Sequence, residues 1–207
     1  MDKRPETIID IQSMLPSIVL DVRYYSNDNF MGRPIDGYLA PKAFLSISAC
    51  RALEKAQNML ASFDLGLKVY DAYRPQMSVD HFIRWSQDEH DTQMKSIYYP
   101  DLDKSALFNK GFIASKSSHT RASTVDVTLV SLSSPSFQVL DMGTIWDYFH
   151  PSSWTHYNKI THEQRANRML LQQVMSDVGF MGLAQEWWHF TLKEEPFPKT
   201  YFNFPIE

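Results

Sequence analysis

Cysteine is nearly absent from this chain of 207 residues. Because Cys50 is the only cysteine, no intrachain disulfide can form. The pattern around Cys50 is helical, which predicts a small core residue rather than a nucleophile. Apolar runs of the roughly 20 residues that a membrane span needs are missing, and the first residues lack the pattern of a signal peptide. We therefore expect a cytoplasmic protein, or a periplasmic one if a leader has been removed.

An excess of charge of either sign is also missing, since the formal net charge is −4. This balance indicates neither a nucleic acid nor an anionic membrane as partner. The chain has 7 glycines, and none of them forms a phosphate-binding loop after a strand. The HExxH motif of many zinc peptidases is absent as well.

What is present is a mixture of helical and strand patterns without a repeating strand–helix–strand rhythm. Helical spacing covers residues 41–63, 77–87 and 161–180, and strand patterns cover residues 67–75, 123–130 and 186–192. Thr161 and Gln164 predict a capping box at the start of the third helix. Its predicted buried stripe comprises Met169, Leu170, Val174 and Val178. We predict an α+β fold over residues 1–207, a single domain with a mostly antiparallel central sheet flanked by helices.

His119 and Asp126 stand out because the first lies in a polar turn and the second in the strand that follows it. Asp126 is flanked by Val125 and Val127, so its carboxylate projects away from two apolar neighbours. A carboxylate inside a strand is costly to bury unless it is paired or binds a metal. The spacing alone leaves two interpretations open, a metal ligand or a salt bridge to Arg121. Of the 7 histidines, His119 and His189 are set apart by their surroundings, and the others are expected to be surface or structural groups. These others are His81, His90, His150, His156 and His162.

Glu186 and His189 are polar residues inside the apolar segment Glu186-Trp187-Trp188-His189-Phe190. Residues three apart on a regular strand face opposite sides, so both can enter one site only if Glu186 lies at the strand end or a bulge turns it. The alternative is a core histidine bonded to backbone, with Glu186 at the surface. Trp187 and Trp188 either wall such a site or belong to the core.

Together, His119, Asp126 and His189 are the ligand types of a zinc site whose fourth position is open to water. Zinc lowers the pKa of bound water from about 15.7 to about 7. Glu186 is the candidate general base, and Arg74 is the candidate cation for the oxyanion of a tetrahedral intermediate.

Four segments in this order resemble the D-alanyl-D-alanine dipeptidases of the vancomycin-resistance type, which are zinc peptidases related to the D,D-carboxypeptidases. The segments are DAYRP, SKSSHTRASTVDVTL, MGTIWDYF and EWWHFTLKEEPFP. The resemblance begins near Arg23 and covers nearly the whole chain. It implies one Zn²⁺ on His119, Asp126 and His189, with Glu186 as base and Arg74 stabilising the transition state.

The same resemblance implies that Tyr24 and Asp147 hold the free amine of a small dipeptide substrate, and that Ser117 holds its carboxylate end. It also implies the D,D-peptidase fold and a role in peptidoglycan precursor metabolism or vancomycin-type resistance. Two alternatives stay open: a D,D-carboxypeptidase that acts on peptidoglycan stem peptides, and a metal-binding module without activity. Assembly into a homo-oligomer is left open too.

Two positions depart from the pattern of the family, which commonly has glycine where this chain has Ala72 and Ala122. If the backbone at Ala122 needs a positive φ, alanine costs about 1–2 kcal/mol there. The residues expected to carry the chemistry are all retained.

Overall fold

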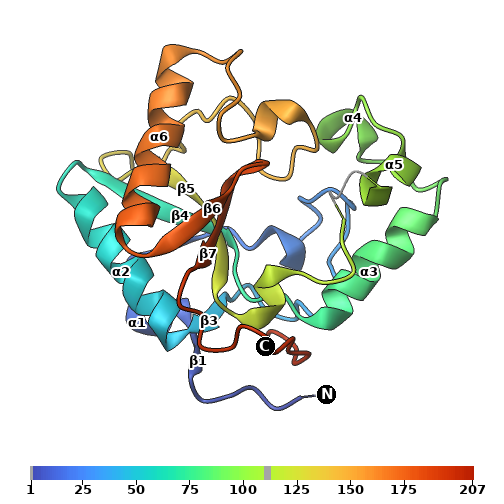
Figure 1. Cartoon of the computed structure of the whole chain (residues 1–207), viewed down its shortest axis with the longest axis horizontal. Helices are drawn as coiled ribbons and strands as arrows, with labels where there is room; N and C mark the ends of the chain where they lie inside the picture. The colour runs from blue at the N-terminus through green and yellow to red at the C-terminus, as the bar shows by residue number, and fades with distance from the viewer. Residues whose placement is uncertain (1, 110–112) are drawn as a thin grey trace.

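The computed structural model describes residues 2–109 and 113–207 as one α+β domain (Figure 1). Its main sheet has the strand order β2-β4-β5-β7-β6. The strands are β2 (Val19–Leu20), β4 (Leu65–Asp71), β5 (Thr124–Ser131), β7 (Glu186–Leu192) and β6 (Phe180–Leu183). Only the β2–β4 pair is parallel among these neighbours, which confirms a mostly antiparallel sheet. A second, small antiparallel sheet joins β1 (Ile8–Asp10) to β3 (Phe44–Ser46).

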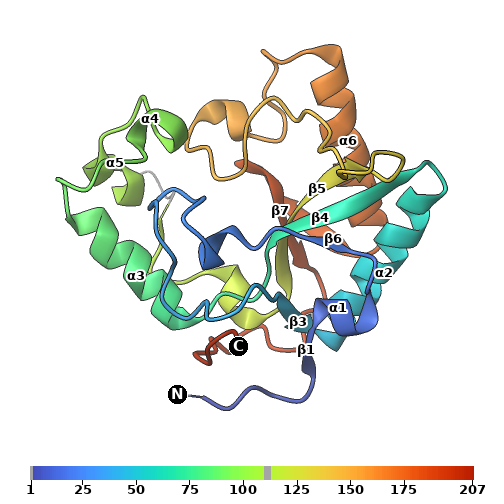
Figure 2. The same cartoon turned by 180° about the vertical axis from the view of Figure 1, so that it is seen from behind.

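The helices form two groups, one packed against the main sheet and one at the other side of the molecule (Figure 1 and Figure 2). The α-helices are α1 (Ile11–Met14), α2 (Ile47–Ala61), α3 (Gln76–Gln87), α4 (Lys95–Tyr98), α5 (Lys104–Asn109) and α6 (His162–Asp177). The 3-10 turns are η1 (Arg23–Tyr25), η2 (Ser118–Arg121) and η3 (Pro151–Ser153). Helices α2 and α6 pack together beside the sheet, whereas α3, α4 and α5 lie at the opposite side of the molecule (Figure 2). None of the helices among the described residues is both long and apolar enough to cross a membrane.

Strand β5 lies at the centre of the sheet and is buried at every position except Ser131. The predicted alternation is present, with Val125, Val127 and Leu129 on one face and Asp126 and Thr128 on the other. Because β4 and β7 flank it on both edges, Asp126 is held in an interior position rather than at the surface.

The helix predicted from residue 41 begins instead at Ile47. Phe44–Ser46 pairs with Ile8–Asp10, and this distant partner draws three residues of helical spacing into a strand. Ser46 then caps α2, since its side chain accepts a hydrogen bond from the backbone N–H of Ala49. Cys50 is fully buried in α2, as expected of a core residue. The strand predicted for residues 67–75 ends earlier than expected, at Asp71.

The capping box of Thr161 and Gln164 is confirmed at the start of α6. The predicted stripe is wrong in part, because Met169 is 64% exposed and the buried residues of the helix are Arg168, Leu171, Val174 and Met175. Arg168 turns inward because its guanidinium finds backbone carbonyls to bind. Strand β6, which the sequence patterns did not predict, forms a hairpin with β7 directly after α6.

Candidate functional site

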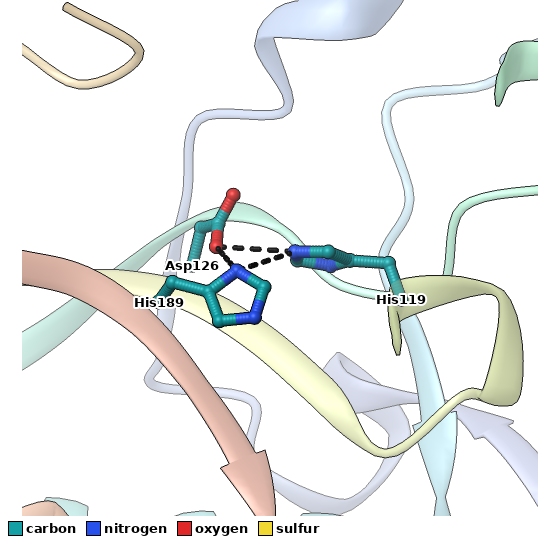
Figure 3. A group of neighbouring side chains, drawn as sticks. All are labelled: His119, Asp126 and His189. Carbon is teal, nitrogen blue, oxygen red and sulfur yellow. Dashed lines mark hydrogen bonds and ion pairs between the residues drawn. The ribbon is translucent and has the colours of Figure 1, made fainter. Parts of the chain in front are cut away.

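His119, Asp126 and His189 reach one point from three different elements (Figure 3). Asp126 and His189 are cross-strand neighbours on β5 and β7, so their side chains share a face of the sheet. His119 comes from η2, where the Ser117 side chain caps the turn by accepting the backbone N–H of His119. The interpretation of Asp126 as the partner of Arg121 is wrong, because Arg121 forms a bidentate ion pair with Glu195.

The three side chains form a nearly equilateral triangle of potential ligand atoms. His119 Nε2 lies 3.2 Å from Asp126 Oδ1 and 3.2 Å from His189 Nδ1, and His189 Nδ1 lies 3.3 Å from Asp126 Oδ1. Two ligands about 2.0–2.1 Å from a tetrahedral zinc are separated by about 3.3 Å. Asp126 Oδ1 is buried and finds no hydrogen-bond partner among the described residues. The set therefore fits one face of a zinc coordination tetrahedron.

The outer nitrogens of both imidazoles have partners that suit this arrangement. His119 Nδ1 lies 2.7 Å from the carbonyl oxygen of Ala72. Because a carbonyl only accepts, Nδ1 carries the proton and Nε2 presents its lone pair to the centre. His189 Nε2 lies 3.2 Å from the Ser118 hydroxyl, which leaves Nδ1 to face the same centre. Although burial alone raises the pKa of Asp126, the two imidazoles hold this pKa far below its usual range.

Glu186 joins the triangle because the strand pairing is irregular where β7 begins. Gly182 pairs with Phe190, but Leu183 already pairs with Glu186, so the intervening β7 residues bulge. Glu186 Oε2 thereby lies 3.4 Å from His189 Nδ1, which a regular strand does not allow. Its side chain is 26% exposed. Burial raises the pKa of Glu186, and the Asp126 charge adds to this effect.

Arg74 stands next to this group and is held in place by Asp71. Arg74 Nε donates to Asp71 Oδ2 at 2.9 Å, and its Nη2 lies 2.8 Å from the same oxygen. The other Asp71 oxygen accepts a 2.6 Å hydrogen bond from the Tyr38 hydroxyl. The guanidinium also lies 5.1 Å from the centre of the Tyr24 ring, a cation–π distance. Sequence reasoning did not identify Asp71, although its position three residues before Arg74 was the available signal.

Tyr24 and Asp147 form a second pair in the same region. The Tyr24 hydroxyl donates to Asp147 Oδ2 at 2.6 Å, and both residues are buried. Asp147 has a φ of 58°, a left-handed conformation that aspartate tolerates better than most residues. Burial raises the pKa of Asp147 well above its usual value, and the charge of Asp126 raises it further.

One cavity of about 320 Å³ connects these groups. All eight residues expected to form the site line it: Tyr24, Arg74, Ser117, His119, Asp126, Asp147, Glu186 and His189. Neither Trp187 nor Trp188 lines the cavity, and both belong to the core. Of the two interpretations of these tryptophans, the one that places them in the core is therefore confirmed, and the one that makes them walls of the site is not.

Both positions where the family commonly has glycine are buried. Ala122 ends η2 with φ 58° and ψ 30°, so this turn does need a left-handed residue and carries alanine all the same. The turn keeps its shape, because the Ala122 backbone N–H donates to the carbonyl of His119. Ala72 contributes its carbonyl to His119 and needs no positive φ.

Comparison with known proteins shows the family of the chain. The chain is 40% identical over 196 residues to a D-alanyl-D-alanine dipeptidase of Streptomyces coelicolor, covering 95% of this chain and 96% of the relative. It is 37% identical to a protein of the same name from Enterococcus faecalis over the same shares of each chain. A relative of that name from Enterococcus faecium is 35% identical, with 90% of this chain and 92% of the relative covered. Residues 4–207 match peptidase family M15, described as D-Ala-D-Ala dipeptidase, and the chain therefore belongs to that family.

Proposed function

We propose that this protein is a zinc-dependent dipeptidase that hydrolyses D-Ala-D-Ala to two molecules of D-alanine. The family and the names of the relatives support the reaction. The observation that supports a bound metal is the triangle of His119, Asp126 and His189, into which an Asp126 oxygen without a hydrogen-bond partner points. We assign the reaction to the metabolism of peptidoglycan precursors, in vancomycin-type resistance or in dipeptide salvage.

Zinc on these three residues supplies a Lewis acid that lowers the pKa of water and polarises the scissile carbonyl. Glu186 takes the proton of the attacking water and delivers it to the nitrogen of the leaving D-alanine. A carboxylate works best in both directions when its pKa lies near the working pH, and burial moves the pKa of Glu186 upward from its usual value. Such proton transfer contributes about 10²–10⁴ in rate.

Arg74 provides positive charge for the oxyanion that forms when the peptide carbonyl becomes tetrahedral. Its two contacts with Asp71 and its position over the Tyr24 ring hold the guanidinium in one orientation before substrate arrives. An arginine that is fixed in advance loses little conformational entropy in the transition state.

Asp147 and Tyr24 recognise the ammonium group of the dipeptide, and Ser117 recognises its carboxylate. The ammonium is the natural partner for Asp147, because Tyr24 satisfies only one of its carboxylate oxygens. A cavity of about 320 Å³ suits a small zwitterion with two methyl side chains.

The test combines metal analysis with product release. The purified protein should contain one zinc per chain and release D-alanine from D-Ala-D-Ala, and chelation should abolish this release. An N-acylated tripeptide that ends in D-Ala-D-Ala should be a poor substrate, because its neutral amide cannot form an ion pair with the Asp147 carboxylate. Clear preference for the acylated tripeptide would establish the alternative, a D,D-carboxypeptidase, and zinc binding without hydrolysis of either substrate would establish a silent metal-binding module.

A further inference from the structure

Trp146 is a buried residue that touches the candidate metal centre without offering it a ligand. Its indole Nε1–H donates to Asp126 Oδ2 at 3.1 Å, and Trp146 is 2% exposed. Within residues 2–109 and 113–207, this is the one hydrogen bond that Oδ2 receives. The other oxygen, Oδ1, is the buried atom without a hydrogen-bond partner that faces the two imidazoles.

The two oxygens of Asp126 are therefore in different environments. A carboxylate with both oxygens free can bind a metal through either one or through both. The indole occupies Oδ2 and leaves Oδ1 to the centre. Because the indole is neutral, it orients the carboxylate without cancelling the negative charge that a cation needs. Arg74 is the nearest arginine to this carboxylate, with its Nη2 3.9 Å from Oδ2, but the same Nη2 is closer to Asp71, at 2.8 Å.

The surrounding residues hold the indole firmly enough for this role. Trp146 stacks on Tyr70, with 5.4 Å between ring centres and 23° between planes, and lies 4.9 Å from the Tyr24 ring. The loop that carries Trp146 is clamped by Arg168. This buried guanidinium donates to the carbonyls of Met142, Ser152 and Trp154.

We propose that Trp146 is a positioning residue for the metal centre, which holds Asp126 as a ligand through the single oxygen Oδ1. This inference rests on the proposed zinc site. Partners of this kind, bonded to a ligand rather than to the metal, typically contribute 10–100-fold to metal affinity.

The experiment measures zinc binding by the metal-free full chain in competition with a chromophoric chelator. Trp146→Phe keeps an aromatic ring between Tyr70 and Tyr24 but removes the N–H donor. We expect zinc affinity to fall by about 10–100-fold. Trp85→Phe is the matched control, because Trp85 is 4% exposed, its Nε1 has no hydrogen-bond partner among the described residues, and it does not line the cavity. We expect the control to bind zinc like the wild type.

Two further measurements separate positioning from a general loss of structure. Circular dichroism and thermal unfolding compare the folding of both variants with the wild type. With cobalt in place of zinc, Trp146→Phe should change the visible absorption spectrum, since the coordination of Asp126 changes, whereas Trp85→Phe should leave it unaltered. In the wild type, the indole N–H resonance of Trp146 should shift on zinc addition and that of Trp85 should not, which tests the contact even if the variant fails to fold.

The inference is overturned if folded Trp146→Phe binds zinc as tightly as the wild type with an unchanged cobalt spectrum. It is also overturned if the indole N–H resonance of Trp146 in the wild type does not shift on zinc addition. A wild-type chain that binds no zinc overturns the proposed function instead, so the two failures are distinguishable.

Discussion

Replacing Asp147 by Asn should make the protein more stable and, at the same time, a much weaker dipeptidase. Asp147 is 7% exposed, and its carboxylate is balanced by a hydrogen bond from Tyr24 rather than by a contacting cation. Asparagine keeps the side-chain oxygen that Tyr24 binds and tolerates the left-handed backbone at φ 58°. The substitution therefore removes the charge while conserving the shape.

The direction of the pH dependence follows from the raised pKa of Asp147 in the folded protein. Below the pKa of the unfolded chain the carboxyl is neutral in both states, and its burial carries no penalty for charge. As pH rises through the folded pKa, the wild type loses about 1.36 kcal/mol for each unit by which the two pKa values differ. The asparagine side chain does not titrate, so the variant should gain stability over the wild type as pH rises, until the difference levels off above the folded pKa.

Urea unfolding of the metal-free proteins between pH 4 and pH 8 measures this difference. Asp141→Asn is the control, because hydrogen bonds from Gln164 and from the Gly143 backbone lower the pKa of that exposed carboxyl. The control should gain no stability with rising pH. If the free energy of unfolding of Asp147→Asn at pH 8 is equal to or lower than that of the wild type, the buried charge does not destabilise the folded protein as we infer.

Activity supplies the second half of the test. Losing one partner of a desolvated charge pair costs about 3–5 kcal/mol, which corresponds to a fall in kcat/KM for D-Ala-D-Ala of about 10²–10⁴. Propionyl-D-alanine lacks the ammonium group, so the wild type and the variant should hydrolyse it at similar rates. A variant equally impaired on both compounds would show that Asp147 does not recognise the ammonium.

Three other substitutions test separate parts of the structure. Glu186→Ala should lower turnover by about 10²–10⁴ while zinc still binds, as metal analysis beside a D-alanine assay will show; retained turnover would remove Glu186 from the mechanism. His119→Ala should lose both zinc and activity, and a variant that keeps stoichiometric zinc would exclude His119 as a ligand. Gly179→Ala should lower the free energy of unfolding by about 1–2 kcal/mol in urea because the backbone φ is 99° and a new Cβ meets only a Leu192 methyl at 4.0 Å; an unchanged midpoint would contradict the strain.

Local sequence patterns predicted those elements that depend on their own residues. The capping box of Thr161 and Gln164 is one example, since both partners lie within a single helical turn. The alternation of β5 is another. The helix predicted from residue 41 failed because Phe44–Ser46 takes its conformation from Ile8–Asp10, a partner more than 30 residues away. The stripe of α6 failed because Arg168 is satisfied by distant carbonyls, which hydrophobic periodicity cannot foresee.

The candidate site divides in the same way. The sequence by itself determined which side chains were available and, through four short segments, which family they resemble. Only the tertiary structure decided that Asp126 lies opposite His189, because strand register depends on the packing of both faces and not on either strand alone. It also decided that the bulge before Phe190 turns Glu186 inward, and that Asp71 and Trp146 support Arg74 and Asp126. Asp126, His189 and Trp146 are far apart in the chain, and the position of Glu186 depends on an irregular strand, so no short-range pattern encodes these contacts. Asp71 and Arg74 are only three residues apart, but their spacing alone does not show that the two side chains meet.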